Sequence, residues 1–337
     1  MNTNEPKYFR VGLIGLGAIS NNHIRSLLAL ENVNLCALCD IDQSRLLKKK
    51  QEYSLNCNTY TDYQEMIVCE NLDAVHILTP HYLHASMTVF ALEHGVNVFL
   101  EKPLGISLLD IERVREAEKN SGKQVCVCFQ NRFNPSTILA KKLAVEDGGV
   151  TRAYATIIWS RNASYYAKDA WRGKWKTEGG GVMINQAIHT LDLLCQFLGK
   201  PQSIKATCQN HHLDGIIEVE DMCEGLVQFE DKKQCVFYAT TAFNGADITT
   251  VYLKTQNHTI MLQNEKIFVD GELQTLDETQ VPYFGKKCYG RGHPELIGRF
   301  YEALEDGAEV PVNTESAQYA LRLLLGAYKS NGNETII

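Results

Sequence analysis

The sequence predicts two domains, an α/β domain followed by an α+β domain. Over residues 1–130, short apolar segments alternate with helical patterns, which is typical of a parallel, doubly wound sheet buried on both faces. Past about residue 150, strand-like segments follow one another directly and favour a large, mainly antiparallel sheet with one open face. A chain of 337 residues also fits two domains better than one. We expect the domains to cover 1–130 and 131–337.

The first domain carries a regular alternation of elements. Each apolar segment is long enough for one strand, and a helical pattern follows each of them except the last. The expected strands are 9–15, 33–40, 73–80, 97–103 and 124–130, and the expected helices are 19–30, 43–53, 81–94 and 107–120.

The second domain reads as a succession of antiparallel strands. Several segments alternate polar and apolar residues, and the dipeptides at 244–245 (Asn-Gly) and 270–271 (Asp-Gly) suit hairpin turns. Helical patterns at 295–304 and 314–328 close the chain. The expected strands are 151–161, 203–209, 223–230, 234–243, 248–255, 258–264 and 266–271.

Composition excludes several classes of protein. The formal net charge is −7 and no long basic block is present, which argues against nucleic-acid binding. No apolar stretch reaches the roughly 18 residues of a membrane span, and the start lacks a secretory signal pattern. The eleven cysteines have no repeated spacing, and Cys36 and Cys39 lie inside an apolar strand. We expect buried free thiols in a cytoplasmic protein.

A glycine pair follows the first strand and opens the first helix. Gly15 permits a tight turn, and Gly17 lets the backbone approach a pyrophosphate at the positive end of the helix dipole. The third position of this fingerprint is Ser20 rather than glycine, a small departure. Asp40 ends the second strand about 20 residues further on, as a dinucleotide-binding domain requires.

Asp40 decides the choice between NAD and NADP. Its carboxylate can accept hydrogen bonds from the ribose hydroxyls and would repel a 2′-phosphate. Ile41 and Asp42 follow it, so no arginine stands directly after it, and NAD is favoured over NADP. The alternative is that Asp40 only caps the helix that starts near Gln43.

A line of polar residues marks the helical pattern that follows the glycines at 179–181. Asn185, His189 and Asp192 fall in one sector of a helix that is apolar on most other sides. Either they form a buried network in which Asp192 holds His189, or they face a ligand. The preceding glycines would let the backbone lie close to that ligand.

The ordered motifs resemble one family. GLIGLGAIS, DAVHILTPHYLH, LEKP and NQAIHTLD occur in this order, with the change to antiparallel strands before the last of them. This set is similar to that of the glucose–fructose oxidoreductase, inositol dehydrogenase and rhizopine catabolism (Gfo/Idh/MocA) family. The resemblance covers nearly the whole chain and implies a Rossmann domain and an NAD-dependent oxidoreductase acting on sugars.

The resemblance also implies roles for individual residues. It makes Lys102 and His189 catalytic, with a Lys102–Pro103 peptide that is often cis. The residues expected to bind substrate are Asn185, Asp192, Arg172, Trp171 and Tyr165. Those expected to bind the cofactor are Gly15, Gly17, Ala18, Ile19, Ser20, Asp40, Ile41, Thr79, Pro80, His84, Glu101, Lys102, Gln130, Trp171 and Arg172.

Asn185 departs from the inositol dehydrogenases, which carry an aspartate at the matching position. Because an asparagine cannot take a proton, acid–base work would fall on Lys102 and His189. This departure points towards a glycoside or nucleotide sugar rather than an inositol. The tract over 165–189 is similar to that of family members that oxidise the 3-hydroxyl of such pyranoses. The resemblance therefore implies hydride transfer at a secondary hydroxyl, C3, of a pyranose, glycoside or nucleotide sugar. The alternatives are an NAD-retaining glycosidase that oxidises C3 transiently and a non-catalytic sugar or dinucleotide sensor.

Two further expectations concern metals and partners. His211 and His212 lie near Cys208 and Asp214, but no second ligand cluster accompanies them, so no metal is expected. His293 precedes a proline at a helix entrance, and its role stays open between structure and substrate contact. The open face of the second sheet suggests a homodimer or homotetramer, with a small-molecule sugar as the other partner and neither membrane nor nucleic acid.

Overall fold

The computed structural model describes residues 8–245, 247–276 and 290–337. These residues form two compact units. The first unit contains the described residues of 1–105, 109–130 and 281–316. The second contains 106–108, the described residues of 131–280, and 317–337.

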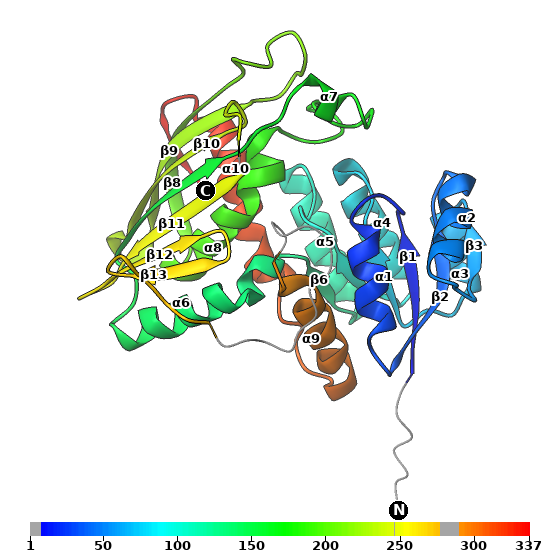
Figure 1. Cartoon of the computed structure of the whole chain (residues 1–337). Coiled ribbons are helices and arrows are strands. Elements are labelled where there is room, and N and C mark those ends of the chain that lie inside the picture. Colours follow the sequence, from blue (N-terminus) through cyan, green and yellow to red (C-terminus); the bar gives the residue numbers. More distant parts are fainter. Residues whose placement is uncertain (1–7, 246, 277–289) are drawn as a thin grey trace, which may run out of the picture. The chain divides into compact units, whose positions relative to one another are not determined.

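The first unit is built on a six-stranded sheet in the order β3-β2-β1-β4-β5-β6 (Figure 1). Every pairing in it is parallel, and the first strand lies near the middle, so the predicted doubly wound sheet is confirmed. The short polar strand β3 was not predicted, because it lacks an apolar run. The strands are β1 Phe9–Ile14, β2 Val33–Cys39, β3 Asn58–Tyr60, β4 Ala74–Ile77, β5 Asn97–Leu100 and β6 Val125–Val127.

The helices of this unit begin close to their predicted positions. Asp42 and Asp62 cap α2 and α3, each accepting a hydrogen bond of 2.9 Å from the backbone N–H two residues on. The helix α3 was missed along with β3, since it spans only two turns. The helices are α1 Ser20–Leu28, α2 Gln43–Glu52, α3 Tyr63–Cys69, α4 His81–Glu93, α5 Leu108–Ser121 and α9 Gly292–Asp306.

Helix α9 belongs to the first unit although it follows the strands of the second in sequence. Its buried face is aromatic. The Tyr301 ring centroid lies 5.4 Å from that of Phe9, and Phe300 lies 5.4 Å from Phe99. The Tyr301 hydroxyl also bonds His76 Nε2 at 2.9 Å. Burying these rings against β1, β4 and β5 accounts for the return of the chain to the first unit.

The second unit is built on a nine-stranded sheet in the order β14-β13-β12-β11-β7-β10-β9-β8-β15 (Figure 1). Only the β7–β10 pairing is parallel among the described residues, so the mainly antiparallel sheet is confirmed. The strands are β7 Arg152–Ile158, β8 Pro201–Gln209, β9 Met222–Phe229, β10 Gln234–Thr240, β11 Ile248–Lys254, β12 Thr259–Gln263, β13 Lys266–Val269, β14 Glu272–Leu273 and β15 Glu334–Ile336.

Helices cover one face of this sheet and leave the other open. Helices α6 and α8 pack on the strands, and Gly326 of α10 lies close to Ile204 of β8. On the opposite face Tyr154 is 47% exposed and Val236 is 55% exposed. The helices of this unit are α6 Pro135–Glu146, α7 Ala163–Tyr166, α8 Ile188–Leu198 and the part of α10 (Thr314–Ser330) that follows residue 316.

Cys208 and Cys223 form a disulfide, so the expectation that all cysteines are free is wrong for this pair. They face each other directly across the antiparallel β8–β9 pair, with Cα atoms 4.1 Å apart. Such cross-strand neighbours are 15 residues apart in sequence and cannot be recognised from spacing. The other cysteines in the described part of the chain are free, and nearly all are buried.

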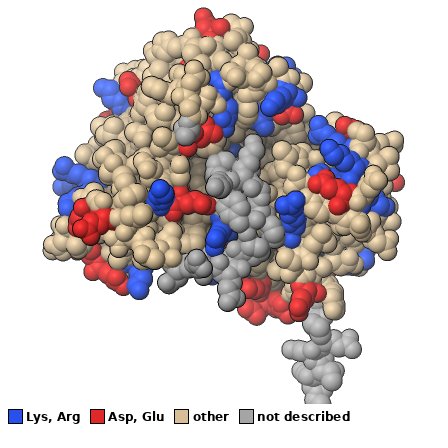
Figure 2. Space-filling model, in the orientation of Figure 1, with Lys and Arg blue, Asp and Glu red and all other residues tan. Residues whose placement is uncertain are grey.

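The distribution of charge on the surface agrees with the absence of a long basic block in the sequence. On the face drawn in Figure 2, lysine and arginine side chains are interspersed with acidic ones rather than gathered in one basic patch. Within the described ranges, no helix combines the length and apolarity that crossing a membrane needs.

Candidate functional site

The glycine loop of the first unit has the geometry of a phosphate-binding turn. Gly15 adopts a φ of +93°, and a Cβ there would lie 2.7 Å from the Leu78 carbonyl oxygen. A Cβ on Gly17 would meet no atom within 4 Å, so the loop is open on that side. Ser20, the first residue of α1, donates from Oγ to the Gly17 carbonyl oxygen at 2.7 Å and steadies the turn without a third glycine. The N-terminus of α1 therefore lies beside open space, as anion binding requires.

Asp40 is tied to the glycine loop. Its Oδ2 accepts a 2.7 Å hydrogen bond from the Leu16 N–H, and its Oδ1 accepts one of 2.9 Å from the Asp42 N–H. The alternative that Asp40 caps α2 is wrong, because Asp42 supplies that cap. Arg45 Nη1 lies 3.9 Å from Asp40 Oδ2 and was missed, since it stands one helical turn into α2 rather than next to Asp40. Ile41 is exposed beside them.

His84 links the loops that follow β4 and β5. Its Nδ1 lies 2.7 Å from the Pro103 carbonyl oxygen and its Nε2 lies 2.8 Å from the Thr79 carbonyl oxygen. Burial lowers the pKa of His84, and a neutral ring can donate to only one of these carbonyls. The Lys102–Pro103 peptide is cis, as the resemblance implied. His84, expected as a cofactor contact, is therefore a buried brace for the loop that carries Lys102.

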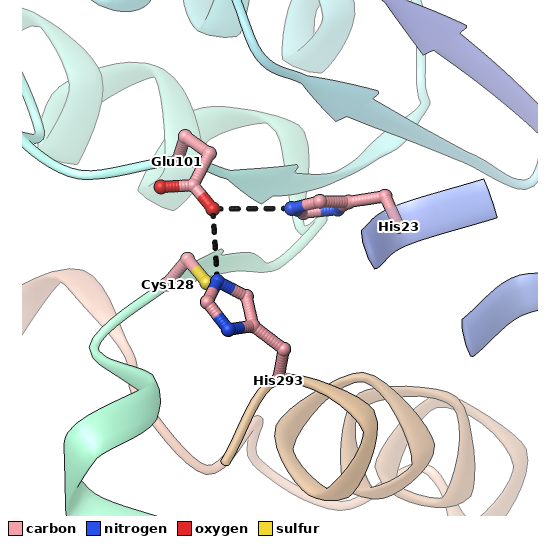
Figure 3. Close-up of side chains that lie close together, drawn as sticks. All are labelled: His23, Glu101, Cys128 and His293. Atoms are coloured by element: carbon pink, nitrogen blue, oxygen red, sulfur yellow. Dashed lines mark hydrogen bonds and ion pairs between the residues drawn. The ribbon is translucent and has the colours of Figure 1, made fainter. Parts of the chain in front are cut away.

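Glu101 lies in a buried polar network (Figure 3). Its Oε1 lies 3.1 Å from His23 Nε2 and 3.6 Å from His293 Nε2, and the Cys128 thiol points into the same space. Burial alone would raise the pKa of Glu101, but the hydrogen bonds from His23 and His293 outweigh it and hold the pKa well below its usual value. His293 thus contributes to a buried network of the first unit.

The network continues through two more side chains. His23 Nδ1 lies 2.9 Å from His76 Nδ1, and His76 Nε2 lies 2.9 Å from the Tyr301 hydroxyl. Burial holds the pKa of His76 well below its usual value, so this ring is neutral. Neither His23 nor His76 belonged to a predicted site, because they lie on a helix and inside a strand.

Lys102 follows β5 at the carboxyl edge of the parallel sheet. The loops after β1, β2 and β4 end at the same edge, which carries Gly15, Asp40 and Thr79. Lys102 is half-buried there. Gln130 is buried at the start of the turn after β6. Since ligands of open α/β sheets bind at this edge, the first unit gathers most of the predicted cofactor residues where a dinucleotide binds.

In the second unit, the predicted polar line crosses a change of helix type. Residues Met183–Ala187 form a π-helical turn, and α8 begins at Ile188. The wider π turn changes the angle between successive side chains, and the hydrogen bonds of Asn185 and Asp192 lead to different parts of the unit. Asn185 Nδ2 donates to Glu178 Oε1 at 2.6 Å. Glu178 is fully buried and was missed, because it stands before the glycines and outside any helical pattern.

Asp192 forms a buried ion pair. Its Oδ2 accepts from Arg132 Nε at 2.8 Å and its Oδ1 accepts from Arg132 Nη2 at 2.5 Å. Asp192 is 1% exposed, so both oxygens are used inside the unit. Its expected role in binding sugar hydroxyls or orienting His189 stays a prediction. Arg132 is 60 residues away in sequence, which is why the pairing was not foreseen.

The glycines before the π turn make room for protein rather than for ligand. A Cβ on Gly179 would lie 2.6 Å from the Ile106 side chain, and one on Gly181 would overlap the Glu220 carbonyl oxygen. The buried Glu220 carboxylate accepts 2.9 Å hydrogen bonds from the Gly181 and Met183 N–H groups. Tyr328 donates to it at 2.9 Å. This carboxylate stabilises the entrance of the helix that carries Asn185 and His189.

The predicted aromatic and arginine residues gather around Tyr165. Arg172 Nη1 donates to the Tyr165 hydroxyl at 2.7 Å, and its guanidinium lies 4.8 Å from the Tyr165 ring centroid and 4.5 Å from that of Trp171. Glu178 Oε1 lies 3.7 Å from Arg172 Nη1. Asn185, Arg172 and Tyr165 thus lie together, with Glu178 as the residue that joins them. Their role in binding substrate stays a prediction. His189 is half-buried one turn further along.

Two domain models of one family match the chain. The model described as an oxidoreductase family with an NAD-binding Rossmann fold covers residues 9–129, and the GFO/IDH/MocA C-terminal domain covers residues 144–260. Together they span more than half of the chain. The chain belongs to the Gfo/Idh/MocA oxidoreductase family. The resemblance predicted from the motifs is confirmed, as is NAD as the cofactor of the first unit.

Known proteins similar to this chain align over almost all of it. The myo-inositol 2-dehydrogenase of Thermotoga maritima is 25% identical over 332 residues, covering 95% of this chain and 96% of that protein. The WlbA dehydrogenase of Bordetella pertussis, crystallised with NADH and UDP-GlcNAcA, has a TM-score of 0.86 at 24% identity and 98% coverage of both chains. A levoglucosan dehydrogenase, crystallised with NADH and levoglucosan, has a TM-score of 0.88 at 18% identity, covering 98% of this chain and 100% of that one.

Proposed function

We propose that this Gfo/Idh/MocA protein moves a hydride between NAD and a secondary hydroxyl, C3 of a pyranose, glycoside or nucleotide sugar. The position of Lys102 is the main observation behind the proposal. Lys102 follows β5 at the sheet edge where the Gly15–Gly17 loop and Asp40 also lie. Its peptide bond to Pro103 is cis, and His84 contacts the Pro103 carbonyl oxygen. The family members named above that act on or bind an inositol, a UDP-sugar and levoglucosan support a sugar or polyol as substrate.

Bound NAD supplies the hydride acceptor. The ammonium group of Lys102 stabilises the negative charge that develops on the substrate oxygen as its proton leaves. His189 receives that proton, because the unperturbed pKa of an imidazole is close to neutral. The products are the ketone, reduced NAD and a protonated base, so electrons and protons balance.

The second unit supplies substrate binding in this proposal. Tyr165, Trp171 and Arg172 present ring faces and N–H donors, which suit a pyranose. Asn185 is held by the buried Glu178 at 2.6 Å, which fixes the orientation of its amide group. A neutral amide positioned in this way binds a hydroxyl and leaves the proton to His189.

The test is a screen for NAD reduction with inositols, free sugars, glycosides and UDP-sugars. The proposal expects NADH to accumulate with a pyranoside or nucleotide sugar, and the product ketone to be at C3 by mass spectrometry after borodeuteride reduction. NADH formation with inositols alone would overturn the assigned substrate class.

The same screen separates the alternatives. A chromogenic glycoside that releases its aglycone without net NADH would assign the chain as an NAD-retaining glycosidase. NAD binding by calorimetry, with neither NADH nor aglycone from any sugar, would assign it as a sensor. Both results would contradict the proposed net dehydrogenase.

A homodimer or homotetramer formed through the open sheet face completes the proposal. Tyr154, Leu226 and Val236 expose apolar surface on strands that helices cover only on the other side. Covering such a surface with a second copy removes apolar area from water.

A further inference from the structure

Four side chains with metal-ligating atoms converge inside the first unit. His23 comes from α1, Glu101 follows β5, Cys128 follows β6, and His293 lies in the first turn of α9. One donor atom from each lies within 4.8 Å of every other, and the side chains point toward one another (Figure 3). We propose that this cluster binds one structural Zn²⁺ ion through two imidazoles, a carboxylate and a thiolate.

The distances fit four-coordinate zinc after small movements. Zn–N, Zn–O and Zn–S bonds of about 2.0–2.3 Å place tetrahedral ligand atoms roughly 3.3–3.8 Å apart. Glu101 Oε1 lies 3.1 Å from His23 Nε2 and 3.6 Å from His293 Nε2, close to this range. The widest separation in the cluster is under 4.8 Å, so the ligands need to close by about 1 Å at most.

The outer partners fit a metal-bound imidazole. When His23 Nε2 binds a metal, its Nδ1 must carry the proton and donate it. His76 Nδ1 lies 2.9 Å away as the acceptor, and His76 Nε2 can then donate to the Tyr301 oxygen at 2.9 Å. This chain fixes the ring orientation and tautomer of His23, as second partners do for metal-binding histidines.

Burial makes the site structural rather than catalytic. His23 and Cys128 have no exposed surface, His293 is 2% exposed and Glu101 is 9% exposed. Four protein ligands in a closed space leave no position for a reacting water. The ion would bind the start of α9 to the strand ends that carry Glu101 and, one residue on, Lys102. The thiol distinguishes this arrangement from a plain hydrogen-bonded network, because a thiol is a weak hydrogen-bonding group but a strong zinc ligand when ionised.

Metal content of the tag-free full chain, produced with zinc in the medium and dialysed against metal-free buffer, tests the proposal. Mass spectrometry of the element should give close to one zinc per chain. Cys128→Ser and His293→Gln should each reduce this content at least about 10-fold. Cys126→Ser, a buried thiol outside the cluster, is the matched control and should keep the zinc.

Two further measurements test zinc binding without relying on the cluster variants. Cobalt-loaded wild-type protein should show the intense visible bands of a tetrahedral site and a thiolate-to-cobalt charge-transfer band, and this test does not require a variant to fold. Replacing His211 and His212 with glutamine, in the exposed loop, should leave the zinc content unchanged. Wild-type protein that binds NAD but holds no zinc and gives no tetrahedral cobalt spectrum would overturn the proposal, as would zinc lost only on changing the exposed pair.

Discussion

At the scale of single residues, two charged side chains are held in place by the backbone around the strand that each follows. Lys102 is half-buried after β5, where a loop braced by His84 limits its movement. Asp40 follows β2 and is anchored by two backbone N–H groups. A charge held in place in this way costs little to reorganise when a substrate or cofactor arrives, so its removal should change function more than fold.

Lys102→Met should separate chemistry from cofactor binding. Loss of the ammonium group removes stabilisation of the developing oxyanion, so kcat should fall by about 10²-fold or more. The dissociation constant for NAD, measured by calorimetry, should change by less than about 3-fold. Lys119→Met, at an exposed position on α5, is the control. A variant with near-normal kcat would remove Lys102 from the proposed mechanism.

Asp40→Asn should relax the preference for NAD. Without the carboxylate charge, the 2′-phosphate of NADP is no longer repelled, and Arg45, now 3.9 Å from Asp40, is free to pair with it. The ratio of kcat/KM for NAD to that for NADP should fall at least about 10-fold, or roughly 1.4 kcal/mol. Asp62→Asn, which alters the cap of α3, should leave the ratio as it is. An unchanged ratio in Asp40→Asn would show that another group selects the cofactor.

At the scale of elements, the helix that carries Asn185 and His189 depends on two buried carboxylates. Glu220 accepts N–H groups at its entrance, and Asp192 of α8 pairs with Arg132 of the turn after β6. Desolvation raises the pKa of Glu220 to about 7 despite these hydrogen bonds. Glu220 compensates backbone N–H groups at the start of the π turn, and Asp192 neutralises a buried arginine further along the helix.

Glu220 should make the protein less stable as pH rises. Its folded pKa of about 7 lies above the unfolded value near 4.5, so its contribution is complete below about pH 4.5 and is lost as pH rises through 7. Over that window the loss is about 3 kcal/mol, at 1.36 kcal/mol per pKa unit. The unfolding free energy of Glu220→Gln should lack this slope when the two proteins are compared from pH 5 to 8. Glu218→Gln, an exposed neighbour, should keep it, and identical slopes in all three proteins would refute the assignment.

Asp192→Asn tests whether Asp192 supports the fold or binds the substrate. Breaking a buried bidentate pair leaves the Arg132 charge without its partner and should lower the unfolding free energy by about 3–5 kcal/mol. Denaturant unfolding measures this loss, while KM below the melting transition should stay within about 3-fold of wild type. Asp247→Asn, in a partly exposed pair with Arg161, should cost much less. A raised KM with unchanged stability would restore Asp192 to the substrate site.

At the scale of the whole molecule, the open face of the second sheet is the proposed interface between copies of the chain. Its helix-free face carries exposed apolar residues from neighbouring strands β7, β9 and β10. Monomeric proteins rarely leave such contiguous apolar surface in water.

Val236→Glu should disrupt the proposed homo-oligomer. Val236 is 55% exposed on β10, and a carboxylate there would be desolvated when a second copy covers the face. Light scattering after size exclusion should show a dimer or tetramer for the wild type and a monomer for the variant. Val145→Glu, at an exposed position on α6, should keep the wild-type mass. A monomeric wild type, or a variant of unchanged mass, would exclude this face as the interface.

The sequence determined the features that depend on residues close together in the chain. The turn at Gly15, the strand end at Asp40 and the Lys102–Pro103 pair are local patterns. The order of these motifs was enough to indicate the family from the sequence alone. Alternation of apolar residues likewise predicted a parallel sheet followed by an antiparallel one, because side-chain period follows from backbone geometry.

Only the tertiary structure decided which distant residues meet. Arg132 takes the carboxylate of Asp192, and the Cys208 and Cys223 thiols join across two strands. Such pairings depend on strand order, on register and on a π turn that shifts the angle of every later side chain. None of these can be predicted from the local periodicity of apolar residues. For the same reason no spacing rule could bring His23, Glu101, Cys128 and His293 together, since four elements must fold before their ligand atoms share one space.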